Sequence, residues 1–166
     1  MRTTYASAPA NGIRNVALPR LLLITSDWPP PGRSVKSRAE LLQAAGLNVE
    51  VFAHRGRHPF NYIAAWAALR PRLHRGRYDV VHAQNASNVL LAVPKRVPLV
   101  MTLVASDRPR ALAWLLTRLA DAVIVATEDM SGHVARRVPV HVVPPDLDET
   151  ARTTRLVAVY RSVIRN

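Results

Sequence analysis

Short apolar runs recur along the chain and define its pattern. Six of them are rich in Val, Ile and Leu, and they cover residues 21–25, 49–53, 80–83, 99–105, 122–126 and 140–143. Helix-like stretches lie between them, at 34–45, 60–75, 86–93, 108–120 and 128–137. Apolar strands that alternate with helices indicate a parallel sheet covered on both faces.

The predicted fold class is therefore α/β: a Rossmann-like, doubly wound sheet of about six mostly parallel strands, with helices on both faces. One apolar stripe of the helix over 108–120 consists of Leu112, Leu115, Leu116 and Leu119. The i, i+3, i+4, i+7 spacing of these leucines predicts that the stripe faces the sheet.

A last helix is predicted over about 149–165. Its apolar face consists of Leu156, Val159, Tyr160, Val163 and Ile164. Asp146, with Glu149 three residues later, is expected to cap its start. The chain thus divides into a flexible N-terminal arm (1–19), a Rossmann-like domain (20–148) and a C-terminal amphipathic helix packed on that domain (149–166).

Composition narrows the chemistry. The 166 residues are 49% hydrophobic and 20% charged, which excludes wholesale disorder, and they include no Cys, which excludes disulfides, thiolate catalysis and Cys-based metal sites. No metal site is predicted. The longest apolar run is far shorter than the ~20 residues of a membrane-spanning helix.

The net charge of +12 comes from 23 Lys and Arg against 11 Asp and Glu. Phosphorylated ligands, anionic membranes and nucleic acids all attract such a protein. Only Lys36 and Lys95 are lysines, so the excess of Arg is equally what a GC-rich genome produces. No basic and aromatic residues interleave along a strand, so a nucleic-acid partner is not predicted.

Ligands of a doubly wound sheet bind outside the carboxyl ends of its strands. The loops expected there supply the candidate substrate-binding residues Asp27, Trp28, Gly32, Arg33, Gln84, Asn85, Ser106, Asp107, Thr127 and Glu128. Several of these residues have a structural alternative: Asp107 could cap a helix, and Glu128 could complement a helix dipole without any ligand. His82 is expected to be a hydrogen-bonded residue at a strand end rather than a catalyst. The glycines are isolated, so no dinucleotide or P-loop motif is present.

Several segments together resemble the N-terminal domain of family 4 glycosyltransferases. They are WPPPG at 28–32, GLNVEV at 46–51, YDVVHAQ at 78–84, VPLVMTL at 97–103 followed by SD at 106–107, DAVIVATE at 121–128 and VVPPDLD at 142–148. The resemblance implies one half of the two-domain GT-B fold, with a glycan or lipid-linked acceptor on this half. It also implies a nucleotide-sugar donor on the other half, retention of anomeric configuration and no metal.

The departures from the family pattern are informative. The donor-binding domain has no counterpart, because the chain passes from Asp148 directly to the final helix. The family's His before Ser-Asp is replaced at Val104, so no catalytic residue is assigned. We therefore expect an incomplete, truncated or split enzyme, inactive alone and requiring a separate donor-binding domain or chain.

A non-catalytic module is the alternative, binding a glycan, a lipid-linked sugar or a membrane surface. Arg110, Trp114 and Arg118 are predicted to form one column of the helix over 108–120, a pattern that suits anionic lipid but also an ordinary solvent face. The expected location is cytoplasmic, with peripheral contact at the inner membrane surface.

Overall fold

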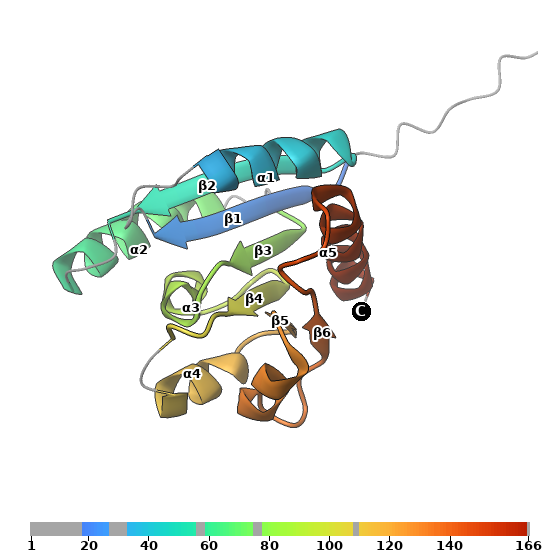
Figure 1. The fold of residues 1–166 in the computed structure, drawn as a ribbon. Helices are drawn as coiled ribbons and strands as arrows, with labels where there is room; N and C mark the ends of the chain where they lie inside the picture. Colours follow the sequence, from blue (N-terminus) through green and yellow to red (C-terminus); the bar gives the residue numbers. More distant parts are fainter. Residues whose placement is uncertain (1–17, 27–32, 56–58, 75–77, 108–109, 166) are drawn as a thin grey trace, which may run out of the picture.

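The computed structural model describes residues 18–26, 33–55, 59–74, 78–107 and 110–165. Its strands are β1 (Arg20–Ser26), β2 (Asn48–His54), β3 (Val80–Ala83), β4 (Leu99–Leu103), β5 (Ala122–Val125) and β6 (Val140–Val142). Its helices are α1 (Arg33–Ala44), α2 (Pro59–His74), α3 (Ala86–Ala92), α4 (Arg110–Thr117), the 3₁₀ helix η1 (Glu128–His133) and α5 (Glu149–Ile164). The strands form one sheet in the order β2-β1-β3-β4-β5-β6, with every pairing parallel (Figure 1). The predicted Rossmann-like α/β fold is confirmed.

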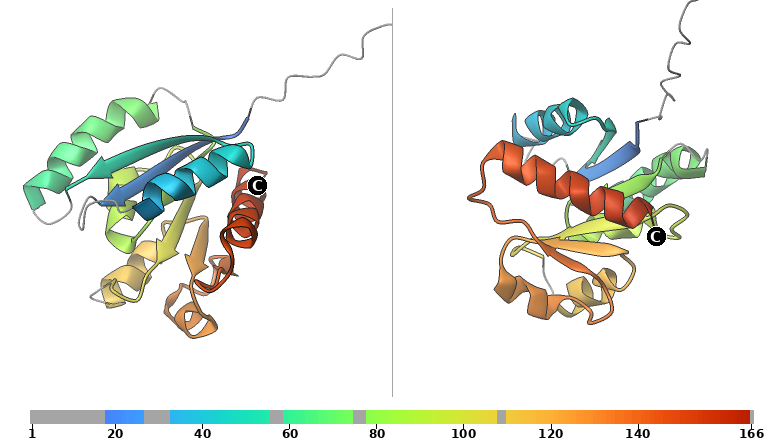
Figure 2. Two further views of the ribbon diagram at one scale, coloured as in Figure 1. Left: turned by 45° about the horizontal axis from the view of Figure 1, so that its top comes forward. Right: turned by 90° about the vertical axis from the view of Figure 1, so that its right-hand side faces the viewer.

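Successive side chains of the strands point to opposite faces, and each face has its own core. Leu22 and Ile24 of β1 pack under α2, α3 and α4. Leu21 and Leu23 of the same strand pack under α1 and α5. Because both faces are covered, the four middle strands are almost continuously apolar, as parallel strands require. Figure 2 shows the two helical layers separated by the sheet.

Helix α5 lies beside α1 on one face of the sheet and contacts β3 and β4 (Figure 2). Tyr160 is completely buried there, as its place on the predicted apolar face requires. The N-cap is Asp148, whose Oδ1 accepts a hydrogen bond from the Ala151 N–H at 2.8 Å. The prediction of Asp146 as the cap was wrong, because the first helical residue is Glu149 and the residue just before it holds the cap position.

Helix α4 is shorter than predicted, and its buried face differs from the leucine stripe. Its buried residues are Ala113, Leu116 and Thr117. Leu112, Leu115 and Leu119 are instead 44%, 51% and 37% exposed. Thr117 is buried because its hydroxyl donates to the Trp114 carbonyl at 2.6 Å and accepts from the Ala135 N–H at 3.1 Å. These bonds satisfy the hydroxyl in the core position that it takes in place of a leucine.

Two further boundaries correct the sequence predictions. The strand expected over 99–105 ends at Leu103, and a turn closed by the Asp107 N–H and the Val104 carbonyl follows it. The helix expected over 128–137 is reduced to η1. Two residues after η1, the Ala135 N–H donates to the Thr117 hydroxyl instead of to a helical carbonyl.

Candidate functional site

A cavity of about 320 Å³ opens at the carboxyl ends of β3, β4 and β5, between the sheet and the two helices α1 and α5. Its polar lining consists of Arg38, His82, Gln84, Thr102 and Arg152. Its apolar lining includes Leu103, Val104, Val125, Met130, Val143 and Leu156. This is the edge at which a doubly wound sheet binds ligands, and it is the edge predicted from the sequence.

Two guanidinium groups reach this cavity from different helices. Arg38 of α1 is half-buried, and burial, opposed by Tyr160 and reinforced by Arg152, lowers the pKa of its guanidinium. Arg152 of α5 donates hydrogen bonds to the carbonyls of Pro145 and Leu147, in the loop before α5. None of the described residues lining the cavity is an Asp or Glu. The cavity is therefore electropositive.

A chain of buried hydrogen bonds runs beneath the cavity from α5 to β4. His82 Nδ1 lies 2.7 Å from the Tyr160 hydroxyl, and His82 Nε2 lies 2.7 Å from the Thr102 hydroxyl. Burial, together with the positive charge of Arg38, lowers the pKa of His82 to about 3. Its imidazole is therefore neutral at physiological pH, and both ring nitrogens have partners, as expected of a hydrogen-bonded histidine at a strand end.

Gln84 follows β3 and also lines the cavity. Its backbone N–H donates to the Ile24 carbonyl at 3.0 Å and so extends the sheet by one bond. Its side-chain Nε2 is buried and has no hydrogen-bond partner. A buried amide donor without a partner is costly, so a polar group of a ligand in this cavity would relieve it.

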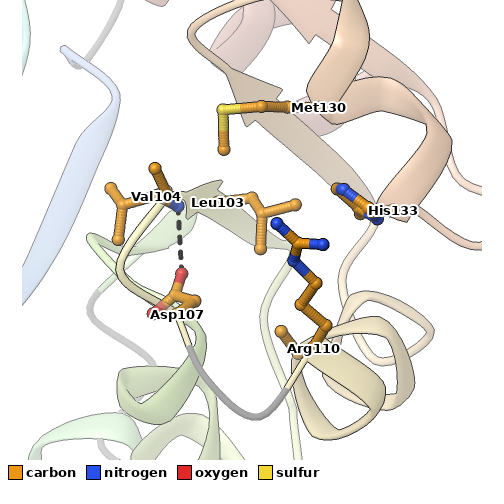
Figure 3. Close-up of a pocket in the computed structure, with 8 residues that line it drawn as sticks. Leu103, Val104, Asp107, Arg110, Met130 and His133 are labelled. Atoms are coloured by element: carbon orange, nitrogen blue, oxygen red, sulfur yellow. Dashed lines mark hydrogen bonds between the residues drawn. The ribbon is translucent and has the colours of Figure 1, made fainter.

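A smaller cavity of about 100 Å³ lies on the other side of the β4–α4 loop. Figure 3 shows Arg110 of α4 extending into it toward Leu103 and His133, and Asp107 bonded to the Val104 N–H. Burial raises the pKa of the Asp107 carboxyl, against the bonds it accepts from the N–H groups of Val104 and Ala86. Those bonds, at 3.0 and 3.2 Å, tie the β4–α4 loop to the first residue of α3.

Only some of the predicted site residues lie in the described part of the chain. Asp27, Trp28 and Gly32 lie outside the described residues, as does the side chain of Arg33, whose backbone begins α1. Asn85 is the N-cap of α3, with its Oδ1 accepting from the Asn88 N–H at 2.9 Å.

The remaining candidates lie at the same edge of the sheet. Ser106 is exposed and lines a third cavity, which lies between α3 and α4. Thr127 is the N-cap of η1 and Glu128 its first residue, and both side chains are exposed. Val104 lines both of the cavities described above, so an apolar side chain stands where the family pattern has His.

The predicted column Arg110–Trp114–Arg118 is only partly present. Arg118 follows the last residue of α4, and its guanidinium carbon lies 5.7 Å from the centroid of the Trp114 ring. Arg110 departs from the column, because it lines the smaller cavity with Asp107 (Figure 3). Trp114 is 42% exposed.

Sequence reasoning missed three residues of the larger cavity: Arg38, Thr102 and Arg152. Arg38 did carry a signal, because it lies one helical turn before Leu42, which is fully buried on the sheet-facing side of α1. A charged residue on the sheet-facing side of a helix indicates that the apolar core ends there and that a polar space begins. Thr102 and Arg152 carried no comparable signal.

The described residues contain no group of three or more His, Cys, Asp or Glu side chains that could hold a metal ion. No helix in the described part of the chain is long and apolar enough to cross a membrane.

Comparison with protein families matches residues 31–150 to Glycosyltransferase Family 4. No curated protein matches the chain in sequence. The match confirms the resemblance drawn from the sequence motifs.

Solved structures of related architecture agree with the fold. Sucrose-phosphate synthase from Thermosynechococcus elongatus superposes with a TM-score of 0.64 at 15% identity, covering 86% of this chain and 98% of that one. MnaA from S. aureus, solved with UDP, gives 0.56 at 14% identity over 76% of this chain and 44% of that one. MurG from Acinetobacter baumannii gives 0.53 at 16% identity over 80% and 47%. The chain thus spans less than half the length of the last two.

Proposed function

The chain belongs to glycosyltransferase family 4, and we propose that it forms the acceptor-binding half of a GT-B glycosyl transfer enzyme. In this proposal residues 20–148 are the acceptor-side unit and residues 149–166 the helix that completes it. The observation that carries the proposal is the cavity at the carboxyl ends of β3–β5, because this edge of the family's N-terminal half faces the donor-binding half.

The reaction assigns distinct tasks to the two halves. An acceptor hydroxyl forms a bond to the anomeric carbon of a nucleotide sugar, the bond from that carbon to the diphosphate oxygen breaks, and the hydroxyl proton passes to the departing diphosphate. This chain would hold and orient the acceptor so that the hydroxyl lies at the open edge of the sheet. Val104 cannot accept a proton, so no side chain at that position serves as a base.

We propose further that transfer requires a donor-binding domain in addition to these 166 residues. The coverage of 44% and 47% of two solved relatives supports this, since the second half of a GT-B fold would supply the remainder. A native pull-down is expected to recover a second Rossmann-like protein. A chain that remains a clean monomer and turns over nucleotide sugars by itself would contradict the proposal.

The direct test incubates the pure chain with labelled nucleotide sugars and a panel of glycan and lipid-linked acceptors. We expect acceptor binding, measured by calorimetry or NMR shifts, without transfer. Adding a donor-binding half is expected to restore transfer. The absence of binding to every acceptor would reject the acceptor-side assignment.

One observation favours a second role, as a module that binds a membrane surface. Helix α4 exposes Leu112, Trp114 and Leu115, with the Arg118 guanidinium over the indole. Amphipathic aromatic, aliphatic and basic side chains in one patch suit the interface of an anionic bilayer. This role would place the protein in the cytoplasm, at the inner surface of the membrane, beside lipid-linked acceptors.

Vesicle flotation tests this second role. Trp114→Ala combined with Arg118→Glu is expected to reduce flotation with anionic vesicles several-fold, and binding of the unmodified chain should fall with added salt. Arg161→Glu, on the exposed side of α5, is the charge-matched control. If both variants lose flotation equally, the effect comes from net charge alone, and the proposal that the α4 surface binds the membrane is rejected.

A further inference from the structure

We propose that Arg38 and Arg152 hold a phosphoryl group, so that the ligand of the larger cavity is a phosphate ester. The inference rests on the proposed function in one respect: it names the class of acceptor that this edge would take.

Arg38 gives the strongest reason. Its guanidinium is half-buried, and the described structure pairs it with no carboxylate; the groups that act on its charge are Tyr160 and Arg152. A second cation close by makes the burial of the first more costly. A charge placed this way is stabilised when an anion occupies the space in front of it.

Arg152 completes a two-sided arrangement. Its hydrogen bonds to the carbonyls of Pro145 and Leu147 fix the side chain without neutralising it, because backbone carbonyls carry no net charge. Arg38 comes from α1 and Arg152 from α5, so the two guanidinium groups approach from separate elements. Arg is well suited to phosphate, because its planar group donates two parallel hydrogen bonds.

Neutral donors accompany the two charges. The Gln84 Nε2 group is buried without a partner, and the Thr102 hydroxyl lies on the same cavity wall. Phosphoryl oxygens accept several hydrogen bonds at once, and they would satisfy this unpaired amide. His82 does not add a third charge, because its pKa of about 3 leaves the ring neutral.

The rest of the wall indicates an ester rather than free phosphate. Leu103, Val125 and Leu156 present apolar surface beside the charged groups. An ion such as inorganic phosphate gains nothing from that surface, whereas the carbon skeleton of a sugar or a lipid phosphate packs against it. The two sources of the phosphoryl group, a free sugar phosphate or a lipid-linked one, are separated by experiment.

The experiment measures binding of the full chain to inorganic phosphate, hexose 6-phosphate, the unphosphorylated hexose and UDP, and to vesicles with and without polyprenyl phosphate. We expect one phosphate ester to bind at least tenfold more tightly than its unphosphorylated counterpart, with affinity falling as salt rises. Tighter binding of UDP than of any other phosphate ester would overturn the assignment to an acceptor. Whether soluble ester or vesicle binds decides the source.

Arg38→Met is the decisive variant. It should reduce binding of the phosphate ester at least tenfold while unfolding at the same temperature as the unmodified chain or a higher one, because it removes a half-buried, unpaired charge. Arg161→Met, on the exposed side of α5, is the matched control and should change neither measurement. If Arg38→Met unfolds at a lower temperature and binds normally, the residue is structural and the proposal fails.

Two further outcomes separate the anion site from the acceptor role. If an unphosphorylated acceptor binds and is glycosylated when a donor half is added, the acceptor role stands without a phosphate site. If the phosphate ester binds through Arg38 but is never glycosylated, the anion site stands and the acceptor role falls.

Discussion

Both faces of the sheet bury polar side chains within an apolar core, but they differ in whether those polar groups border the larger cavity and in what the helices turn outward. The face under α1 and α5 encloses polar groups, namely the chain Tyr160–His82–Thr102 with Arg38 at its border. The face under α2, α3 and α4 encloses the hydrogen-bonded pair His54–Asn88 and the Thr117 hydroxyl, and its helices turn large side chains outward, including Phe60 at 72% and Leu115 at 51% exposure. Buried polar groups that border a cavity mark a place for a ligand, and exposed apolar side chains on the opposite face mark a surface for a partner or a membrane.

The largest expected difference between the faces comes from Tyr160→Ala. Removing a fully buried aromatic ring leaves a cavity and strips His82 Nδ1 of its partner. We expect a loss of about 3–5 kcal/mol in the free energy of unfolding. Urea denaturation followed by circular dichroism measures it. A loss below about 1 kcal/mol would show that α5 is not integral to the fold.

Acid should lower the free energy of unfolding through His82, which lies on the α5 face of the sheet. His82 has a pKa of about 3 in the folded chain, below the ordinary value of 6.5, so only the unfolded state takes up the proton between these two values. The stabilisation is complete above about pH 6.5 and is lost as the pH falls toward 3. We expect a loss of about 2 kcal/mol between pH 7 and pH 5, reduced in His82→Gln.

Denaturation curves at pH 5, 6 and 7 test this linkage. Identical pH profiles for the unmodified chain and His82→Gln would contradict it. His141→Gln is the control, because burial also lowers the pKa of this half-buried residue, which lies on β6 and outside the hydrogen-bond chain.

Removing the cap of α5 should have an intermediate effect. Asp148→Ala deprives the Ala151 N–H of its acceptor and is expected to cost about 1 kcal/mol. Asp146→Ala is the matched control, since Asp146 is exposed and is not the cap. A larger loss in the control than in Asp148→Ala would mean that the cap is misassigned.

The outer surface of α4 should be nearly indifferent to substitution. Leu115→Gln replaces a half-exposed side chain and is expected to change the free energy of unfolding by less than about 0.5 kcal/mol. The same variant should weaken flotation with anionic vesicles. A loss above about 2 kcal/mol would show that Leu115 packs against the core and would remove the contrast between the faces.

More of the fold than of the candidate site could be predicted from the sequence. Strand positions and the α5 face followed from runs and periodicity, because burial on both sides of a parallel sheet leaves a strong apolar signal. The face of α4 did not follow, because Thr117 satisfies a distant N–H, at Ala135, and no local pattern shows that.

For the site, the sequence predicted the location but not most of the polar residues that line it. The motifs indicated the carboxyl edge and the residues Gln84 and Val104, which do line the cavity. Arg152 reaches that edge from a helix at the far end of the chain, and Thr102 is an inward-facing residue within a strand. Their convergence depends on how α5 packs on the sheet, which is a tertiary effect that no spacing reveals.

The bonds of His82 couple the packing of α5 to the chemistry of the cavity. A neutral imidazole has one donor and one acceptor, so its two bonds must run in the same direction along the chain. If the Tyr160 hydroxyl donates to Nδ1, then Nε2 donates to Thr102 and leaves the threonine proton free to point at an anion. If the direction reverses, the Thr102 hydroxyl donates its proton to His82 Nε2, and only its lone pairs are available to a ligand in the cavity. The direction of hydrogen bonding set at α5, together with the tautomer of His82, thus determines whether Thr102 offers a ligand in the cavity a donor or only an acceptor.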